Sequence, residues 1–228
     1  MKKQDIYFLG ATILLFLPFF VSNDVYRFYK DFNHEHGMVM AFVKFAVLAT
    51  LGELIGLRIK TGSYYQSGFG VWPRALVWGF IGLTIKLAFI IFATGTPGFL
   101  SYMGMSDATT VMKGSFSSAK LLVAFSTSAA MNIIYAPVMM TFHKMSDIHI
   151  VSNGGTMKGF LTPAHFDKIL GGMNWDVMWN FVFKKTIPFF WIPAHTITFL
   201  LPPDVQVLFA ALLGIALGTI LAVAGKKK

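Results

Sequence analysis

Charged residues are scarce in this sequence, and cysteine is absent. Only 13% of the 228 residues are Asp, Glu, Lys or Arg, whereas soluble domains usually carry about 25%. This shortage excludes an ordinary soluble domain, and the missing cysteine excludes disulfides and thiolate metal sites. The ten acidic residues are scattered along the chain, so no paired carboxylates of a hydrolase stand out. The GxSxG, P-loop and Rossmann glycine motifs are missing too, and no feature of the sequence positively indicates an enzyme.

Apolar residues make up 55% of the chain and are gathered in runs of roughly 16 to 21 residues. About 20 apolar residues span a bilayer as a helix, whereas the strands of a membrane barrel alternate in polarity over about 10 residues. We therefore predict an all-α, polytopic transmembrane helical bundle that forms a single domain over residues 1–228. The first run follows a basic start, and we read it as a retained helix and not a signal peptide. About six helices are expected, at residues 6–22, 38–57, 75–92, 121–140, 186–201 and 205–224.

The positive charge of the chain, +9 at pH 7, lies at the flanks of the apolar runs. With six spans, thirteen Lys and Arg residues fall on the side of the two termini and four on the opposite side. Cytoplasmic segments carry the excess of basic residues. We therefore expect a multi-pass membrane protein with both termini cytoplasmic, in the inner membrane if the cell is bacterial. Membrane lipids are expected partners, and nucleic acid is not.

Residues 186–208 are apolar enough for lipid, yet they contain several prolines and polar side chains. Proline removes a backbone donor and clashes with the preceding turn. Pro188, Pro193 and Pro202 therefore predict a kinked or broken helix over 186–201. Backbone groups freed inside a membrane must find partners in neighbouring helices or water, so this segment is expected to shape a cavity.

Ionisable side chains within the apolar runs predict a functional or structural site, because each costs roughly 2.5–3.5 kcal/mol to insert. Glu53 and Lys86 lie in neighbouring spans of opposite direction. They are expected either to line a solute or proton path or to form an ion pair that fixes two helices.

Two polar stripes at helical spacing complete the candidate site. Asn132 and Tyr135 follow Ser128 along one face, where they either bond neighbouring helices or line a cavity. In the proline-containing segment, Trp191, His195 and Thr198 share a face. His195 is expected to bond a freed backbone carbonyl or to serve a binding or catalytic role. The predicted cavity-lining residues are Glu53, Lys86, Asn132, Tyr135, Trp191, His195 and Thr198.

Histidines in the polar segments give no specific metal signature. The group His34-Glu35-His36, and the group His143 with Asp147 and His149, lack the HExxH pattern and zinc-type spacing. We interpret them as solvated loop residues and predict neither metal nor cofactor. Gly52-x-x-x-Gly56 and Gly214-x-x-x-Gly218 permit close helix approach, either within the monomer or in a homodimer.

The C-terminal third resembles the Mpv-type peroxisomal membrane protein family, of which the chain looks like a divergent bacterial member. The family pattern W-P-x-x-Q-x-x-N-F is matched with substitutions at Trp191, Pro193, His195, Thr198 and Phe199. The later V-P-x-x-x-R pattern is matched by residues 202–209, with Gln206 in place of Arg. Arg74, Trp78, Gly79 and Gly82 resemble the arginine and glycines before the family's middle helix. The resemblance implies a small helical membrane protein with a pore or channel role.

Three functions remain open from the sequence. The leading hypothesis is a pore or small-solute permeation pathway lined by residues 186–207. The second is a structural or lipid-binding membrane protein that transports nothing. The third is an intramembrane enzyme that uses His195 with Glu53, which requires the two side chains to converge.

Overall fold

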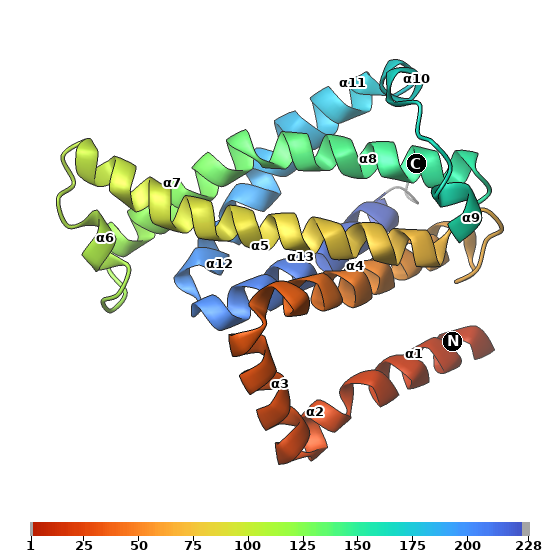
Figure 1. Cartoon of the computed structure of the whole chain (residues 1–228), viewed down its shortest axis with the longest axis horizontal. Helices are drawn as coiled ribbons and strands as arrows, with labels where there is room; N and C mark the ends of the chain where they lie inside the picture. The colour runs from red at the N-terminus through yellow and green to blue at the C-terminus, as the bar shows by residue number, and fades with distance from the viewer. Residues whose placement is uncertain (1, 225–228) are drawn as a thin grey trace.

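The computed structural model describes residues 2–224. The lysines at 226–228, which were predicted to lie on the cytoplasmic side, are outside the described residues. The described chain is all-helical, and its helices run back and forth along the long axis of the molecule (Figure 1). Both described ends of the chain lie toward the same end of that axis (Figure 1). The elements are α1 (Lys3–Phe16), α2 (Pro18–Val21), α3 (Asn23–Glu35), α4 (Gly37–Thr61), α5 (Val71–Tyr102), α6 (Ala108–Val111), α7 (Ser118–Ile134), α8 (Ala136–Ser152), α9 (Met157–Phe160), α10 (Phe166–Gly171), α11 (Trp175–Val177), the π-helix η1 (Met178–Trp191), α12 (Ile192–Leu200) and α13 (Pro203–Ala224).

Three described helices are long and apolar enough to cross a membrane: Gly37–Thr61, Val71–Tyr102 and Pro203–Ile220. The pair α7 and α8, bent by 44° at Tyr135, gives a fourth if the two helices form one span. These helices support a membrane-spanning protein. They do not reach the predicted number of six.

The first predicted span falls short because Pro18 begins a new helix after α1 has ended at Phe16. The 14 residues of α1 extend roughly 21 Å at 1.5 Å per residue, less than the ~30 Å of bilayer hydrocarbon. A single proline has thus divided an apolar run that looked continuous in the sequence.

Within residues 186–201, where a kinked or broken helix was predicted, the helix type changes from π to α at Ile192, and a kink is not confirmed. Pro188 lies inside η1, and the amide of Ile192 donates to Ile187 O in the i→i+5 pattern of a π-helix. The backbone then continues as α12 and turns extended only at Leu201, just before Pro202. The π pattern accommodates the donor missing at Pro188 without a break. Because this segment is divided into a π-helix and a nine-residue α-helix, it is not among the described helices that are long and apolar enough to cross a membrane.

Close packing of α4, α5 and α13 forms the centre of the molecule, with α7 and α12 against it. Glycines permit this approach. A Cβ at Gly82 of α5 would lie 2.5 Å from Ala41 O and 2.8 Å from the Phe45 Cβ of α4. In the same way, a Cβ at Gly52 would lie 3.0 Å from the Ile215 Cα of α13. The first GxxxG glycine is therefore used within the monomer.

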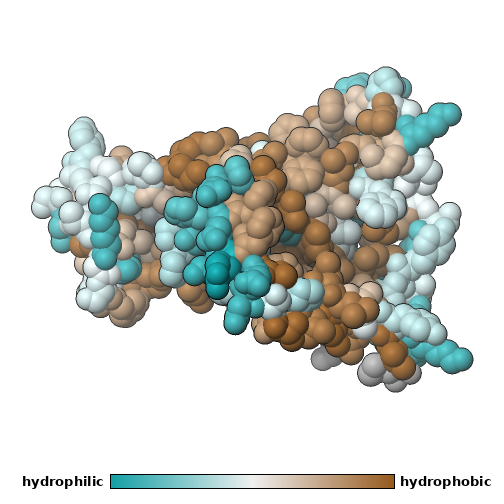
Figure 2. All heavy atoms as spheres, turned by 60° about the horizontal axis from the view of Figure 1, so that its bottom comes forward, coloured by the Kyte–Doolittle hydropathy of each residue, from teal (hydrophilic) through white to brown (hydrophobic). Residues whose placement is uncertain are grey.

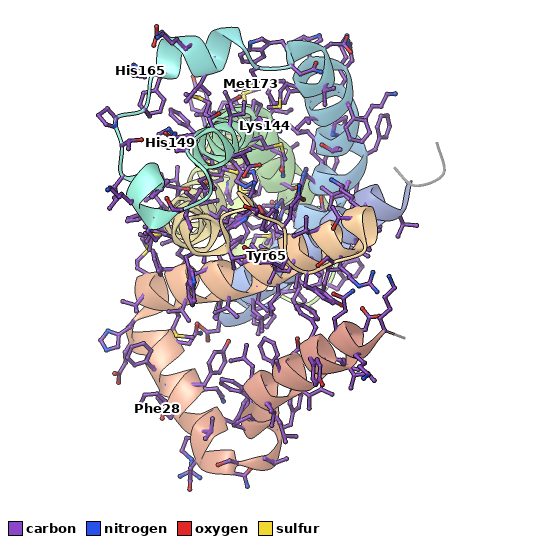
Figure 3. All side chains as sticks on the ribbon, turned by 90° about the vertical axis from the view of Figure 1, so that its right-hand side faces the viewer. Phe28, Tyr65, Lys144, His149, His165 and Met173 are labelled. Atoms are coloured by element: carbon purple, nitrogen blue, oxygen red, sulfur yellow. The ribbon has the colours of Figure 1, made fainter. Side chains whose placement is uncertain are left out.

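The segment α1–α3 stands apart from this centre (Figures 1 and 3). No residue of α1 is buried. It is attached near its start, where Arg58 donates to the two Asp5 oxygens at 2.7 and 2.9 Å. Gln4 donates to Gly62 O at 2.7 Å, and the rings of Phe8 and Tyr64 stack at 4.2 Å. The Arg58 guanidinium lowers the pKa of Asp5 to about 2, so this carboxylate is ionised at neutral pH.

The surface alternates between apolar and polar zones (Figure 2). Polar side chains gather toward the ends of the molecule and over α3, which forms the teal patch in the middle of this view. Large apolar side chains are exposed elsewhere, among them Phe20, Trp72, Phe80 and Phe189. Such exposure is costly in water and expected in contact with lipid.

Candidate functional site

A buried network of charged side chains joins α4, α5 and α8. Glu53 of α4 accepts hydrogen bonds from Arg74 Nη1 and Trp78 Nε1, both at 2.7 Å. Arg74 and Trp78 are four residues apart and share a face at the start of α5. Arg74 Nη1 also bonds Asp147 of α8, while its Nε donates to Phe69 O at 2.8 Å. One guanidinium therefore lies between two carboxylates from different helices.

His143 completes this network from the turn of α8 that precedes Asp147. Its Nε2 lies 3.4 Å from Glu53 Oε1 and 3.8 Å from Asp147 Oδ1. The imidazole packs on the indole of Trp78, with ring centroids 4.3 Å apart. The side chains of Glu53, Arg74, His143 and Asp147 are all less than a quarter exposed. Burial of this kind is tolerated because each ion has a partner of opposite charge.

The atoms of Glu53, His143 and Asp147 lie within 4.8 Å of one another, close enough for the three side chains to ligate one metal ion. Carboxylates and imidazole suit several divalent transition metals. In this structure, however, the Arg74 guanidinium already bonds both carboxylates and supplies the positive charge that a metal would bring. The arrangement is that of an ion-pair network.

Of the histidine groups considered in the sequence, the structure brings His143 and Asp147 together beside Glu53 but places His149 elsewhere. His149 bonds Phe160 O at 2.9 Å and contacts Asn153, on the side of α8 that faces α9 (Figure 3). His34 lies 4.0 Å from Asp204, and His36 lies 3.9 Å from Glu35. Both of these side chains are more than half exposed.

A cavity of about 470 Å³ extends from the charged network into the bundle. Its walls come from α4, α5, α7, α8, η1, α12 and α13, and most of them are apolar. Lining residues at the charged end are Glu53, Lys60, Arg74, Trp78, His143 and Asp147. Those at the inner end are Phe89, Met131, Asn132, Trp191 and His195.

The two ends of the cavity lie far apart. Trp78 contacts Glu53 and His143 at the charged end, whereas Phe89 contacts His195 at the inner end, with ring centroids 5.6 Å apart. Trp78 and Phe89 are eleven residues apart on the uninterrupted helix α5, which corresponds to roughly 16 Å. Glu53 and His195 therefore share a cavity but do not converge on one reacting atom.

Five of the seven predicted site residues line this cavity: Glu53, Asn132, Tyr135, Trp191 and His195. Tyr135 also shares a 2.7 Å hydrogen bond with Thr84 and lines a second cavity of about 610 Å³ between α5 and α8. Thr198 is fully buried, donates to Ala194 O, and is not among the lining residues of either cavity.

Lys86 lies elsewhere, and the predicted Glu53–Lys86 pair is wrong. The Cε of Lys86 lies 3.7 Å from the Cβ position of Gly37, at the start of α4. Glu53 is sixteen residues further along α4, or roughly 24 Å away. The partner of Glu53 is Arg74, which the sequence had placed outside the membrane spans.

Arg74, Trp78, His143 and Asp147 were not predicted as site residues. The sequence did contain an indication of them. Arg74 and Trp78 are four residues apart, as are His143 and Asp147, and this spacing places two side chains on one helix face. Nothing in the sequence showed that the two faces meet at Glu53.

No family model, no curated protein and no solved structure matches this chain. The resemblance to the Mpv-type family thus stays a prediction from the sequence.

Proposed function

We propose that this membrane protein provides a permeation pathway for a small solute, and that the cavity between α4, α5, α7, α8, η1, α12 and α13 is part of that pathway. The observation that carries the proposal is the cavity itself, which joins a buried charged network to a separate group of polar side chains. Polar groups in the interior of a membrane bundle typically mark substrate or ion paths.

The pairing of charges supports a conducting rather than a trapping site. Glu53, Asp147 and Arg74 satisfy one another, so a solute that passes this network meets paired ions. Favourable but weak contacts let a solute leave as readily as it enters.

Solute flux into proteoliposomes tests this function, and two glycines offer a matched pair of variants. A Cβ would meet nothing within 4 Å at either Gly56 or Gly98, so both positions are expected to tolerate a larger side chain. Gly56 lines the cavity on α4, whereas Gly98 of α5 is outside it. Gly56→Leu is expected to remove most of the flux of a permeant solute, and Gly98→Leu to leave it unchanged.

The probes are urea, glycerol and acetamide, followed by vesicle swelling, and K⁺ and Cl⁻, followed by entrapped indicators. Absence of flux for every probe, or equal flux through both variants, contradicts the proposal. Lipid that co-purifies with a protein showing no flux supports instead the lipid-binding alternative.

A further inference from the structure

Two polar atoms at the inner end of the cavity lack hydrogen-bond partners among the described residues. Trp191 Nε1 is buried and unpaired. Asn132 is 1% exposed, and its amide nitrogen donates to Ser128 O at 2.9 Å and to Ser128 Oγ at 3.3 Å. Because a backbone carbonyl only accepts, the amide nitrogen must face Ser128, which leaves Asn132 Oδ1 as an acceptor without a donor.

His195 contributes a third free atom. Its Nδ1 lies 3.3 Å from Thr198 Oγ1, and the Thr198 hydroxyl donates its own hydrogen to Ala194 O at 3.0 Å. Nδ1 must therefore carry the proton and donate to Thr198, so Nε2 is a bare acceptor. His195 is 7% exposed, and its ring stacks on Trp191 with centroids 5.3 Å apart.

Of these three atoms, Trp191 Nε1 is the one that is buried without a partner, and such groups are rare in folded proteins because they lose their hydrogen bonds to water. Trp191, Asn132 and His195 all line the same cavity. Together they offer one N–H donor and two acceptors, the complement of a group that both accepts and donates hydrogen bonds. The ionisable lining residues Glu53, Lys60, Arg74, His143 and Asp147 lie toward the other end, the charged network itself being roughly 16 Å away along α5.

We propose that the inner end of the cavity binds an uncharged hydroxyl or carboxamide group, so that the solute is a neutral small molecule with one such group and an apolar body. The inference rests on the proposed function, since it names the class of solute that uses the pathway. The group accepts from Trp191 Nε1 and donates to Asn132 Oδ1 or His195 Nε2, while the apolar body contacts Phe89 and Met131.

The same atoms disfavour charged groups. A carboxylate only accepts, so it leaves Asn132 Oδ1 and His195 Nε2 unpaired and finds no cation at this end. An ammonium group cannot use the Trp191 donor and finds no carboxylate there. Either ion also loses its hydration and receives in return only neutral hydrogen-bonding partners, with no opposite charge at this end.

A matched series of ligands tests the inference on the unaltered protein. The probes are hexanamide, 1-hexanol, hexanoate and hexylammonium, titrated calorimetrically into nanodiscs that contain the protein, with empty nanodiscs as the blank. Hexanamide and 1-hexanol are expected to bind at least tenfold more tightly than either ion. Hexanoate or hexylammonium binding as tightly as hexanamide overturns the inference.

Variants locate the binding group. Trp191→Phe and His195→Phe keep an aromatic ring but remove the free polar atom, and each is expected to weaken hexanamide binding roughly five- to hundredfold, as an unpaired buried group does. Trp72→Phe is the control, because Trp72 is 77% exposed and outside the cavity. Thermal unfolding verifies that each variant is folded. The ligand series uses the unaltered protein, so it tests the inference even if a variant does not fold.

Unchanged binding by both folded cavity variants overturns the inference. These experiments distinguish a failure of the proposed permeation function from a failure of the proposed ligand class. Selective hexanamide binding without flux of any solute contradicts the permeation function and leaves the ligand class standing. Flux with no preference for neutral probes contradicts the ligand class alone.

Discussion

Arg74 is the residue on which the charged end of the cavity depends. Its guanidinium bonds Glu53, Asp147 and the carbonyl of Phe69, and it lies over the Phe69 ring at 4.4 Å. The planar, five-donor guanidinium bridges these partners at once, whereas the ammonium of lysine is a single point of charge.

Replacing Arg74 with methionine is expected to lower the free energy of unfolding by about 3–5 kcal/mol, the usual cost of removing one member of a buried ion pair. The loss arises because Glu53 and Asp147 then face each other with only His143 to compensate. Arg74→Lys should retain part of the stability. The measurement is reversible unfolding in detergent, with the exposed Arg27→Met as the control. An Arg74→Met protein as stable as the unaltered one would contradict this role.

The candidate site was partly visible in the sequence. Glu53, Asn132, Tyr135, Trp191 and His195 stood out because polar groups are expensive in an apolar run, and all five line the cavity. The pairing of Glu53 was wrong because Arg74, which precedes the third apolar run, is part of helix α5. Helices α4 and α5 extend beyond those runs at the Glu53–Arg74 end, which brings Arg74 to Glu53 and carries Lys86 to the opposite end.

The class of helical membrane protein followed from composition, but the division of the chain into helices did not. Helix α1 ends just before Pro18, whereas Pro188 lies inside a π-helix that begins at Met178 and continues to Trp191. The sequence analysis treated residues 6–22 as one helix despite Pro18, and it expected Pro188 to kink or break its segment.

The contact between α4 and α5 depends on small residues, and Gly82 and Gly95 of α5 test it as a matched pair. A Cβ at Gly82 would meet Ala41 O and Phe45, whereas a Cβ at Gly95 would meet nothing within 4 Å. Gly82→Ala is expected to destabilise the protein by about 1–3 kcal/mol through overpacking. Gly95→Ala should be neutral or stabilising by up to about 1 kcal/mol, because alanine favours the helix. Thermal unfolding of both variants decides the matter, and equal effects would count against the close contact.

At the scale of the whole molecule, the fold separates two polar ends along one axis. The α6 segment lies at one end and α9 at the other, with the candidate spans between them (Figure 1). The excess of Lys and Arg predicts that the end with α9 faces the cytoplasm.

Accessibility of introduced cysteines tests this orientation without background, because the chain has no cysteine of its own. Lys113 and Lys158 are both exposed, in the segment after α6 and in α9. In intact cells a membrane-impermeant maleimide is expected to label Lys113→Cys and to spare Lys158→Cys until the membrane is opened. The reverse pattern would invert the orientation, and labelling of both in intact cells would contradict a membrane between them.

The attachment of α1 has a consequence for the order in which the protein is made. Its partners Arg58, Gly62 and Tyr64 lie more than 50 residues downstream, so α1 leaves the ribosome long before anything exists to hold it. The first helix to be synthesised is thus among the last to form its tertiary contacts. Its polar contacts reach the end of α4 and the following loop, and Phe16 at its other end packs against the central core, so α1 is held at both ends only once that core is in place.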